Sequence, residues 1–138
     1  MSSQPKYKAA SRAKHVLGLV QANVEDPDFW NTFDQNSIIS DAISDGVIFL
    51  PDMPIKDGVG SLEFSEKLST EGEIEKYRYQ ILDCNGLIRT RFESPDCAGD
   101  TEHMHIYGTP GDHNTATKRQ RKRPELEEVF DLFNKLST

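Results

Sequence analysis

The sequence lacks the features that would tie the chain to a membrane or to an oxidising compartment. No stretch approaches the roughly 20 consecutive apolar residues that a membrane-spanning helix needs. The first 23 residues also lack the apolar run and small-residue cleavage site of a signal peptide. The two cysteines, Cys84 and Cys97, are too few for a disulfide framework. We therefore expect a cytoplasmic protein with free thiols and no membrane partner.

Positive charge is also scarce, since the 138 residues carry 16 bases against 23 acids and a net charge of −7. This balance argues against nucleic-acid binding over the whole surface, because domains of that kind are usually basic. The charge is unevenly placed, however: residues 1–24 carry +4, residues 25–117 carry −13 and residues 118–138 carry +2. Any contact with a polyanion is therefore expected to be made by small basic patches on an acidic body.

The length and hydrophobic content predict a single domain over residues 1–138. Residues 1–46 are predicted to form a helical segment, because apolar residues recur at spacings of three and four between Tyr7 and Asn23. Asn36 or Ser37 can cap a second short helix, and Gly46 stands where a left-handed C-terminal residue belongs.

Residues 47–107 are predicted to form an antiparallel sheet, because apolar and polar residues alternate in most of this region. The first strand is expected to end at Pro51 and Pro54. Later in the region, Asn85-Gly86 is a strong signal for a type I′ hairpin turn that pairs Cys84 with Leu87.

That hairpin register can be extended along both strands. It places Leu82 opposite Arg89 and sets four further pairs: Ile81 with Thr90, Gln80 with Arg91, Tyr79 with Phe92, and Arg78 with Glu93. The register separates an apolar face from a polar face. Residues 102–107 alternate again and are expected to form the next strand of the meander.

Residues 108–123 contain Gly, Pro, Asp, Asn and Thr followed by a basic run, which predicts a mobile loop. Residues 124–138 are predicted to form a C-terminal helix, because Pro124 suits its first position and apolar residues follow at helical spacing. The predicted fold class is therefore α+β: an antiparallel meander of four to five strands packed against N-terminal and C-terminal helices.

The polar face of the meander gathers residues suited to cleaving RNA without a metal. Arginine donors match phosphate, histidine exchanges a proton near neutral pH, and a carboxylate or phenol completes an acid–base pair. Arginine also stabilises the charge that develops on the phosphorane. We predict catalytic roles for Arg91, Glu93, His103, His105 and Tyr107. An ordinary solvated face, on which arginines pair with carboxylates, is the competing interpretation.

Contacts with RNA or the ribosome are predicted for basic residues on the sheet and after it. These residues are Arg78, Arg89, Lys118, Arg119, Arg121, Lys122 and Arg123. A solvated charge run beside the start of a helix is an equally open interpretation of the last five.

His103 and His105 have a second interpretation, because side chains at positions i and i+2 of a strand point the same way and can share a metal ion. Asp112 or His113 could then supply a third ligand from the following loop. The motif lacks the glutamate that a cupin-like site places a few residues later, and no cysteine pair supports zinc. No metal or other cofactor is therefore predicted.

Several short motifs in the C-terminal half resemble the TumE family of toxin–antitoxin proteins. They are Tyr77-Arg78-Tyr79, the turn from Asp83 to Ile88, Arg91-Phe92-Glu93, His103-Met104-His105-Ile106 and the helix from Pro124 to Leu136. The resemblance implies a toxin that acts on RNA, and it supports Arg91, His103 and His105 as site residues. The chain differs from the family in having Glu93-Ser94 where Asp-Asn is usual, a longer acidic N-terminal half and the basic run.

A function from another class fits the charge distribution. The acidic region of residues 25–117 could meet a basic protein partner, as in an antitoxin, an immunity protein or an inhibitor of a nucleic-acid enzyme. The sequence therefore leaves two interpretations: an RNA-directed toxin with a histidine and arginine site, and a non-catalytic protein that binds a cognate partner.

Overall fold

The computed structural model describes residues 5–23, 28, 34–56, 60–95 and 101–136. Along the chain, its elements are α1 (Ala9–Asn23), α3 (Gln35–Asp45), β1 (Val47–Lys56), β2 (Gly60–Leu68), β3 (Ile74–Asp83), β4 (Ile88–Glu93), β5 (His103–Tyr107), a 3-10 turn (His113–Thr115), β6 (Ala116–Gln120) and α4 (Leu126–Leu136). The predicted α+β class is confirmed. Among these described residues, no helix is both long and apolar enough to cross a membrane.

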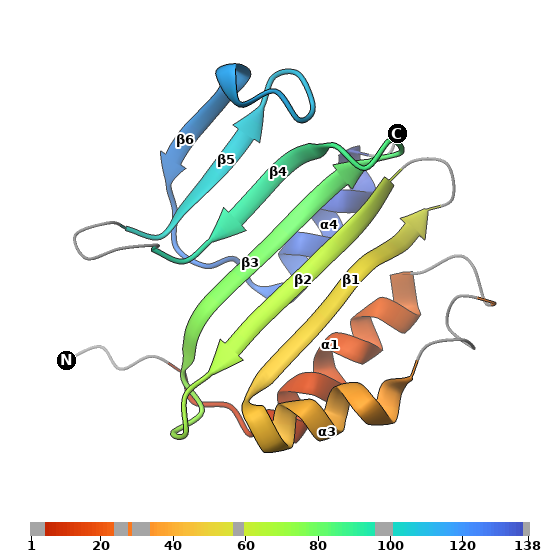
Figure 1. Cartoon of the computed structure of the whole chain (residues 1–138), viewed down its shortest axis with the longest axis vertical. Helices are drawn as coiled ribbons and strands as arrows, with labels where there is room; N and C mark the ends of the chain where they lie inside the picture. The colour runs from red at the N-terminus through yellow and green to blue at the C-terminus, as the bar shows by residue number, and fades with distance from the viewer. Residues whose placement is uncertain (1–4, 24–27, 29–33, 57–59, 96–100, 137–138) are drawn as a thin grey trace.

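The six strands form one antiparallel meander in the order β1-β2-β3-β4-β5-β6 (Figure 1). The sheet therefore has more strands than the four to five predicted, and the additional strand is β6. The prediction of a loop over residues 108–123 was wrong for this part, because Lys118 pairs with His105 and Arg119 with Met104. β6 has a neighbour on one side only and mostly exposed side chains, so it lacks the apolar alternation that reveals a strand.

β1 is the opposite edge of the sheet, and it continues through Pro51 and Pro54 to Lys56 instead of ending at the prolines. Proline is tolerated in an edge strand, where the missing N–H can face away from the single neighbour. The pairing with β2 shifts register after Leu50 and again after Met53, and these irregularities accommodate the prolines.

The hairpin of β3 and β4 has the predicted register for the four pairs from Arg78–Glu93 to Ile81–Thr90. Nearer the turn the prediction was wrong, because Leu82 pairs with Ile88 and not with Arg89. The turn lies one residue earlier than expected, since the Gly86 N–H donates to the Asp83 carbonyl. The Asp83 carboxylate accepts the backbone N–H groups of Asn85 and Leu87, which stabilises this turn.

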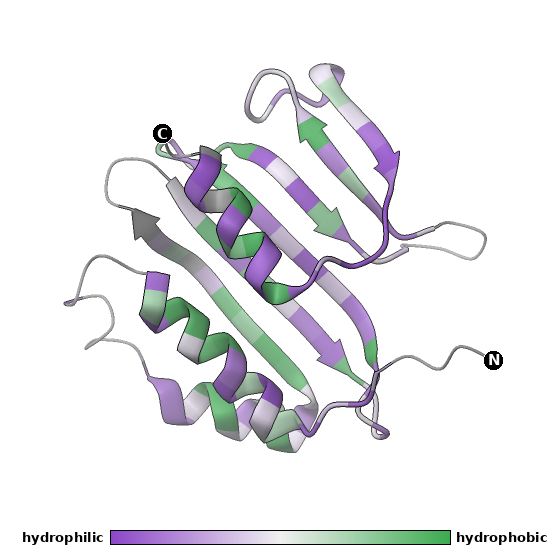
Figure 2. Cartoon of the chain, turned by 180° about the vertical axis from the view of Figure 1, so that it is seen from behind, coloured by the Kyte–Doolittle hydropathy of each residue, from purple (hydrophilic) through white to green (hydrophobic). Residues whose placement is uncertain are grey.

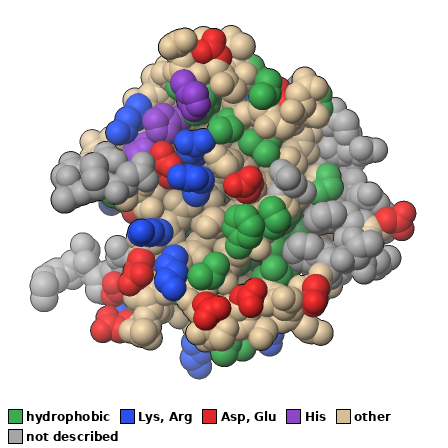
Figure 3. Space-filling model, viewed as in Figure 1, with side chains coloured by type: hydrophobic (Ala, Val, Ile, Leu, Met, Phe, Trp, Pro, Cys, Tyr) green, Lys and Arg blue, Asp and Glu red, His purple; other side chains and the backbone are tan. Residues whose placement is uncertain are grey.

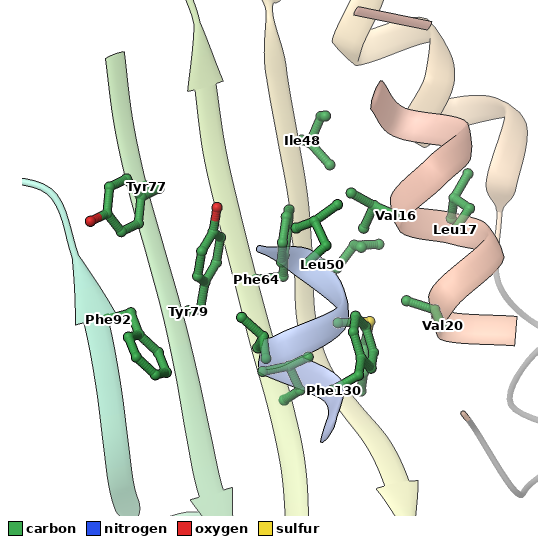
Figure 4. Packing of buried hydrophobic residues seen from close by; sticks show 14 of the residues in the cluster. Val16, Leu17, Val20, Ile48, Leu50, Phe64, Tyr77, Tyr79, Phe92 and Phe130 are labelled. Atoms are coloured by element: carbon green, nitrogen blue, oxygen red, sulfur yellow. The ribbon is translucent and has the colours of Figure 1, made fainter. Parts of the chain in front are cut away.

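The helices create a core on one side of the sheet (Figure 2). Strand residues such as Phe64 and Tyr79 pack towards Val16 and Val20 of α1 and Phe130 of α4 (Figure 4). α3 packs mainly on α1 and β1. Its N-cap is Asp34, which accepts the Ser37 N–H at 3.0 Å, and not the predicted Asn36 or Ser37. Its left-handed C-cap at Gly46 is confirmed by a φ of 69°.

Candidate functional site

The face of the sheet opposite α4 has no helix over β3–β6 among the described residues, and we call it the open face (Figures 1 and 2). The strand register places two rows of polar side chains there. One row is Arg78, Glu93, His103 and Gln120, and the other is Gln80, Arg91, His105 and Lys118. Figure 3 shows histidine, basic and acidic side chains gathered on this face over β4–β6.

Glu93 is the centre of this group. Its Oε1 lies 3.0 Å from Nε2 of His103 and 3.4 Å from Nε2 of His105. Its Oε2 lies 3.4 Å from Nε of Arg78 on the neighbouring strand. Glu93 and His103 are only 5% and 3% exposed, whereas the side chain of His105 is 23% exposed. His105 is therefore the member of the three that reaches solvent.

The orientation of the His103 ring is fixed from the strand end. Its Nδ1 lies 2.7 Å from the backbone carbonyl oxygen of Thr101. A carbonyl only accepts hydrogen bonds, so Nδ1 carries a proton and Nε2 faces Glu93. The ligand atoms of Glu93, His103 and His105 all lie within 4.8 Å of one another. We call these three residues the Glu93 centre.

Arg91 lies beside the Glu93 centre and is positioned by an amide. Its Nε donates to the Gln80 side-chain oxygen at 2.7 Å, and the Gln80 nitrogen donates to Glu63 at 3.0 Å. The pKa of His105 is lowered, first by burial and then by His103, Arg91 and Lys118, although Glu93 acts in the opposite direction. The neutral imidazole of His105 is therefore favoured.

Tyr107 continues the row of rings along β5, with its centroid 6.5 Å from that of His105. Its hydroxyl lies 3.2 Å from Nδ1 of His113, and the two rings meet edge to face. Tyr107 thus interacts with the loop after β5. Asp112 is also used locally, because its side chain accepts the Asn114 N–H. The third group beside the two histidines is Glu93, and not the Asp112 or His113 considered from the sequence.

The predicted basic run is not brought together at this site. Arg121 pairs with Glu128 of α4 and lies 5.3 Å from the Phe92 ring centroid on the core side. Arg123 donates to the Tyr7 hydroxyl at 3.3 Å. Lys118 shares a row with His105, whereas Arg119 alternates to the other face and Lys122 is exposed beyond β6. Arg89 lies next to the register shift at the turn end of β4.

A groove of about 370 Å³ also lies on the open face, and Glu93 is the one residue of the Glu93 centre that lines it. Its lining includes Phe49, Lys67, Lys76, Arg78 and Glu93. Phe49 is 47% exposed, which is unusual for a large aromatic ring, and it shares a cross-strand row with Arg78. Another groove, of about 520 Å³, lies between α3 and the turn after β2, away from this centre.

Sequence reasoning missed two kinds of site residue. Gln80 was placed opposite Arg91 by the predicted register, so its positioning role could have been found from that pairing. The role of Thr101 could not have been found from the sequence, because any residue before the strand offers a backbone carbonyl. Cys84 is an exposed free thiol, and Cys97 lies outside the described residues.

Comparisons with family models, with curated proteins and with solved structures find no match for this chain. The resemblance to the TumE family is not tested by them and stays a prediction.

Proposed function

We propose that the open face binds single-stranded RNA and that the Glu93 centre is where the RNA is cleaved. The observation that carries this proposal is the groove, which combines an exposed aromatic ring with basic side chains and reaches Glu93, one residue of the Glu93 centre. Unstacked bases stack on aromatic side chains, and Lys and Arg contact the phosphates, in proteins that bind single-stranded RNA. Phe49 would receive a base, while Lys76 and Arg78 would contact the backbone.

The burial of the centre assigns different roles to the residues predicted as catalytic. His105 and Arg91 reach the surface and would contact the scissile phosphate, with Arg91 held in place by Gln80. Glu93 and His103 lie behind them and would position His105. Tyr107 would act through His113 at the rim of the site.

RNA binding is tested by fluorescence anisotropy with a labelled single-stranded RNA of about a dozen nucleotides, a length within the usual range of site sizes for single-stranded nucleic-acid-binding folds. Phe49→Ala and Lys76→Ala are expected to weaken binding several-fold each. Arg119→Ala is the matched control, because it removes one exposed cation from the opposite face. The affinity of the wild type should also fall steeply with salt. Equal affinities for the three variants would contradict the proposal.

Cleavage is tested by induction in growing cells and by incubation of the purified protein with RNA. The wild type is expected to arrest growth, and His103→Ala with His105→Ala, at equal soluble level, should relieve the arrest. Growth unaffected by either protein would reject a toxin active in that host.

A non-catalytic partner-binding protein is the second candidate, and one feature of α3 favours it. Ile43 is 65% exposed, and the same helix carries two exposed acids, Asp41 and Asp45, on its other sides. An exposed apolar side chain on an acidic helix suits a basic protein partner. In this case Ile43→Asp should abolish capture of the partner, whereas Phe49→Ala should leave it unchanged.

A further inference from the structure

We propose that Glu93, His103 and His105 bind one divalent transition-metal ion. This inference goes beyond the proposed RNA binding and does not depend on it. It also replaces the sequence-based expectation that the chain uses no metal.

The distances at the Glu93 centre suit such an ion. In a tetrahedral site with metal–nitrogen and metal–oxygen bonds of about 2.0–2.1 Å, neighbouring ligand atoms lie roughly 3.3 Å apart. Oε1 of Glu93 lies 3.0 Å from one histidine Nε2 and 3.4 Å from the other, which brackets that value. The three ligand atoms are all within 4.8 Å of one another. A small rotation of His105, the most exposed of the three, would complete the site.

The surroundings of the three groups match the outer shell of a metal site. Metal-binding histidines commonly donate their second ring N–H to a backbone carbonyl, which fixes the tautomer and the ring orientation. His103 has this arrangement, because its Nδ1 lies 2.7 Å from the Thr101 carbonyl and its Nε2 faces the centre. The second oxygen of Glu93 lies 3.4 Å from Nε of Arg78, which holds the carboxylate in place.

The ligand set indicates the class of ion. Two imidazoles and one carboxylate suit zinc, cobalt, nickel or ferrous iron better than magnesium or calcium, which prefer oxygen. Three protein ligands leave a coordination position open, as in catalytic rather than structural sites. His105 is partly exposed, so the open coordination position would face solvent on the open face of the sheet.

The neighbouring cations add a further expectation. Arg78, Arg91 and Lys118 lie in the same two rows and weaken the binding of a bare cation. They favour an ion that carries an anion, such as hydroxide or a phosphate oxygen, in its open position. The affinity for the metal is therefore expected to rise when inorganic phosphate is present.

The experiment is isothermal titration of tag-free, metal-stripped protein with Zn²⁺ and with Co²⁺, together with the visible absorption spectrum of the cobalt form. We expect one equivalent to bind, with the absorption of a four- or five-coordinate Co²⁺ site. Glu93→Gln and His105→Ala should each weaken binding at least tenfold. His15→Ala is the matched control from outside the centre, because His15 lies on α1 and pairs with Glu127, and it should bind as the wild type does.

Two results would overturn the inference: no binding by the folded wild type, or binding that His15→Ala removes and Glu93→Gln does not. If the folded wild type binds no metal, the Glu93 centre is a cluster of ion pairs and hydrogen bonds only. Circular dichroism of each variant, and the second ligand variant His105→Ala at a partly exposed position, guard against a loss caused by misfolding. RNA anisotropy in the presence of a chelator gives a separate readout, so the proposed function and the metal site can fail independently.

Discussion

Two buried carboxylates on opposite faces of the sheet have very different surroundings. Glu66 is 1% exposed on the core face, and Arg12 of α1 donates to both of its oxygens at 2.9 and 2.7 Å. The Tyr79 hydroxyl donates to it as well. Glu93 is 5% exposed on the open face, and its three partners, two histidines and Arg78, lie at 3.0–3.4 Å.

The difference separates a carboxylate with fixed partners from one with exchangeable partners. Burial opposes the charge on Arg12, yet the hydrogen bond and the charge of Glu66 raise the pKa of Arg12 above its ordinary value. The Arg12 guanidinium also lies 4.4 Å from the Tyr7 ring centroid, so the pair is enclosed by its neighbours. Glu93 instead shares its oxygens with side chains that can bind a proton or a metal. The fixed partners of Glu66 suit it to a structural role. The histidine partners of Glu93 can exchange a proton, which suits Glu93 to catalysis or to metal binding.

The largest expected effect is the loss of stability when Glu66 loses its cation, Arg12. Arg12→Ala leaves a buried carboxylate without its cation, which should cost about 3–5 kcal/mol of unfolding free energy. Arg78→Ala is the matched change on the open face, and because Arg78 is half exposed it should cost less than about 1 kcal/mol. Urea unfolding followed by circular dichroism measures both. Equal losses would show that the two carboxylates are equivalent.

A smaller effect is expected from the two tyrosine hydroxyls. Tyr79→Phe removes a donor to a charged carboxylate and should cost about 1.5–3 kcal/mol. Tyr107→Phe removes a hydroxyl whose hydrogen-bond partner is a ring nitrogen of His113 and not a carboxylate, and it should cost about 0.5–1.5 kcal/mol. The same urea titrations apply, and a reversed order would mean that the Glu66 cluster is looser than its geometry indicates.

The smallest expected effect is the loss of unfolding free energy at alkaline pH. Burial, followed by the charge and hydrogen bond of Glu66, raises the pKa of Tyr79 well above its ordinary value of 10.0, and burial does the same for Tyr77. Above that ordinary pKa the unfolded chain releases the tyrosine proton while the folded chain keeps it, so rising pH favours unfolding. Between pH 10 and 11 the wild type should therefore lose about 1 kcal/mol through Tyr79. Tyr79→Phe should show a shallower dependence, and identical slopes would contradict the assignment.

Local pattern was enough to predict much of the fold and part of the site. The register of the β3–β4 hairpin was predicted from the Asn85-Gly86 turn and agreed with the alternation, and it correctly paired Arg78 with Glu93. The alternation of His103 and His105 likewise put both rings on one face. These features depend on residues close together in the chain or on a strand period of two, which sequence patterns record.

The remainder depends on contacts that no local pattern records. Arg12 and Glu66 are 54 positions apart, and only the packing of α1 on the sheet brings them together. Glu66 did carry a signal, because a charged residue in the apolar row of Phe64 and Leu68 needs a buried partner. The identity of that partner did not follow, and neither did the strand hidden in the basic residues of β6.

An open sheet exposes backbone N–H and C=O groups at both of its edges, and those groups can pair with the edge of another molecule. Each edge of this sheet carries a feature that opposes such pairing. Pro51 and Pro54 remove donors from β1 and coincide with its irregular register. β6 carries Lys118 and Arg119 at the opposite edge, where two like-charged copies would repel. The basic residues of β6 are thus expected to oppose edge-to-edge aggregation, and this expectation does not depend on RNA binding.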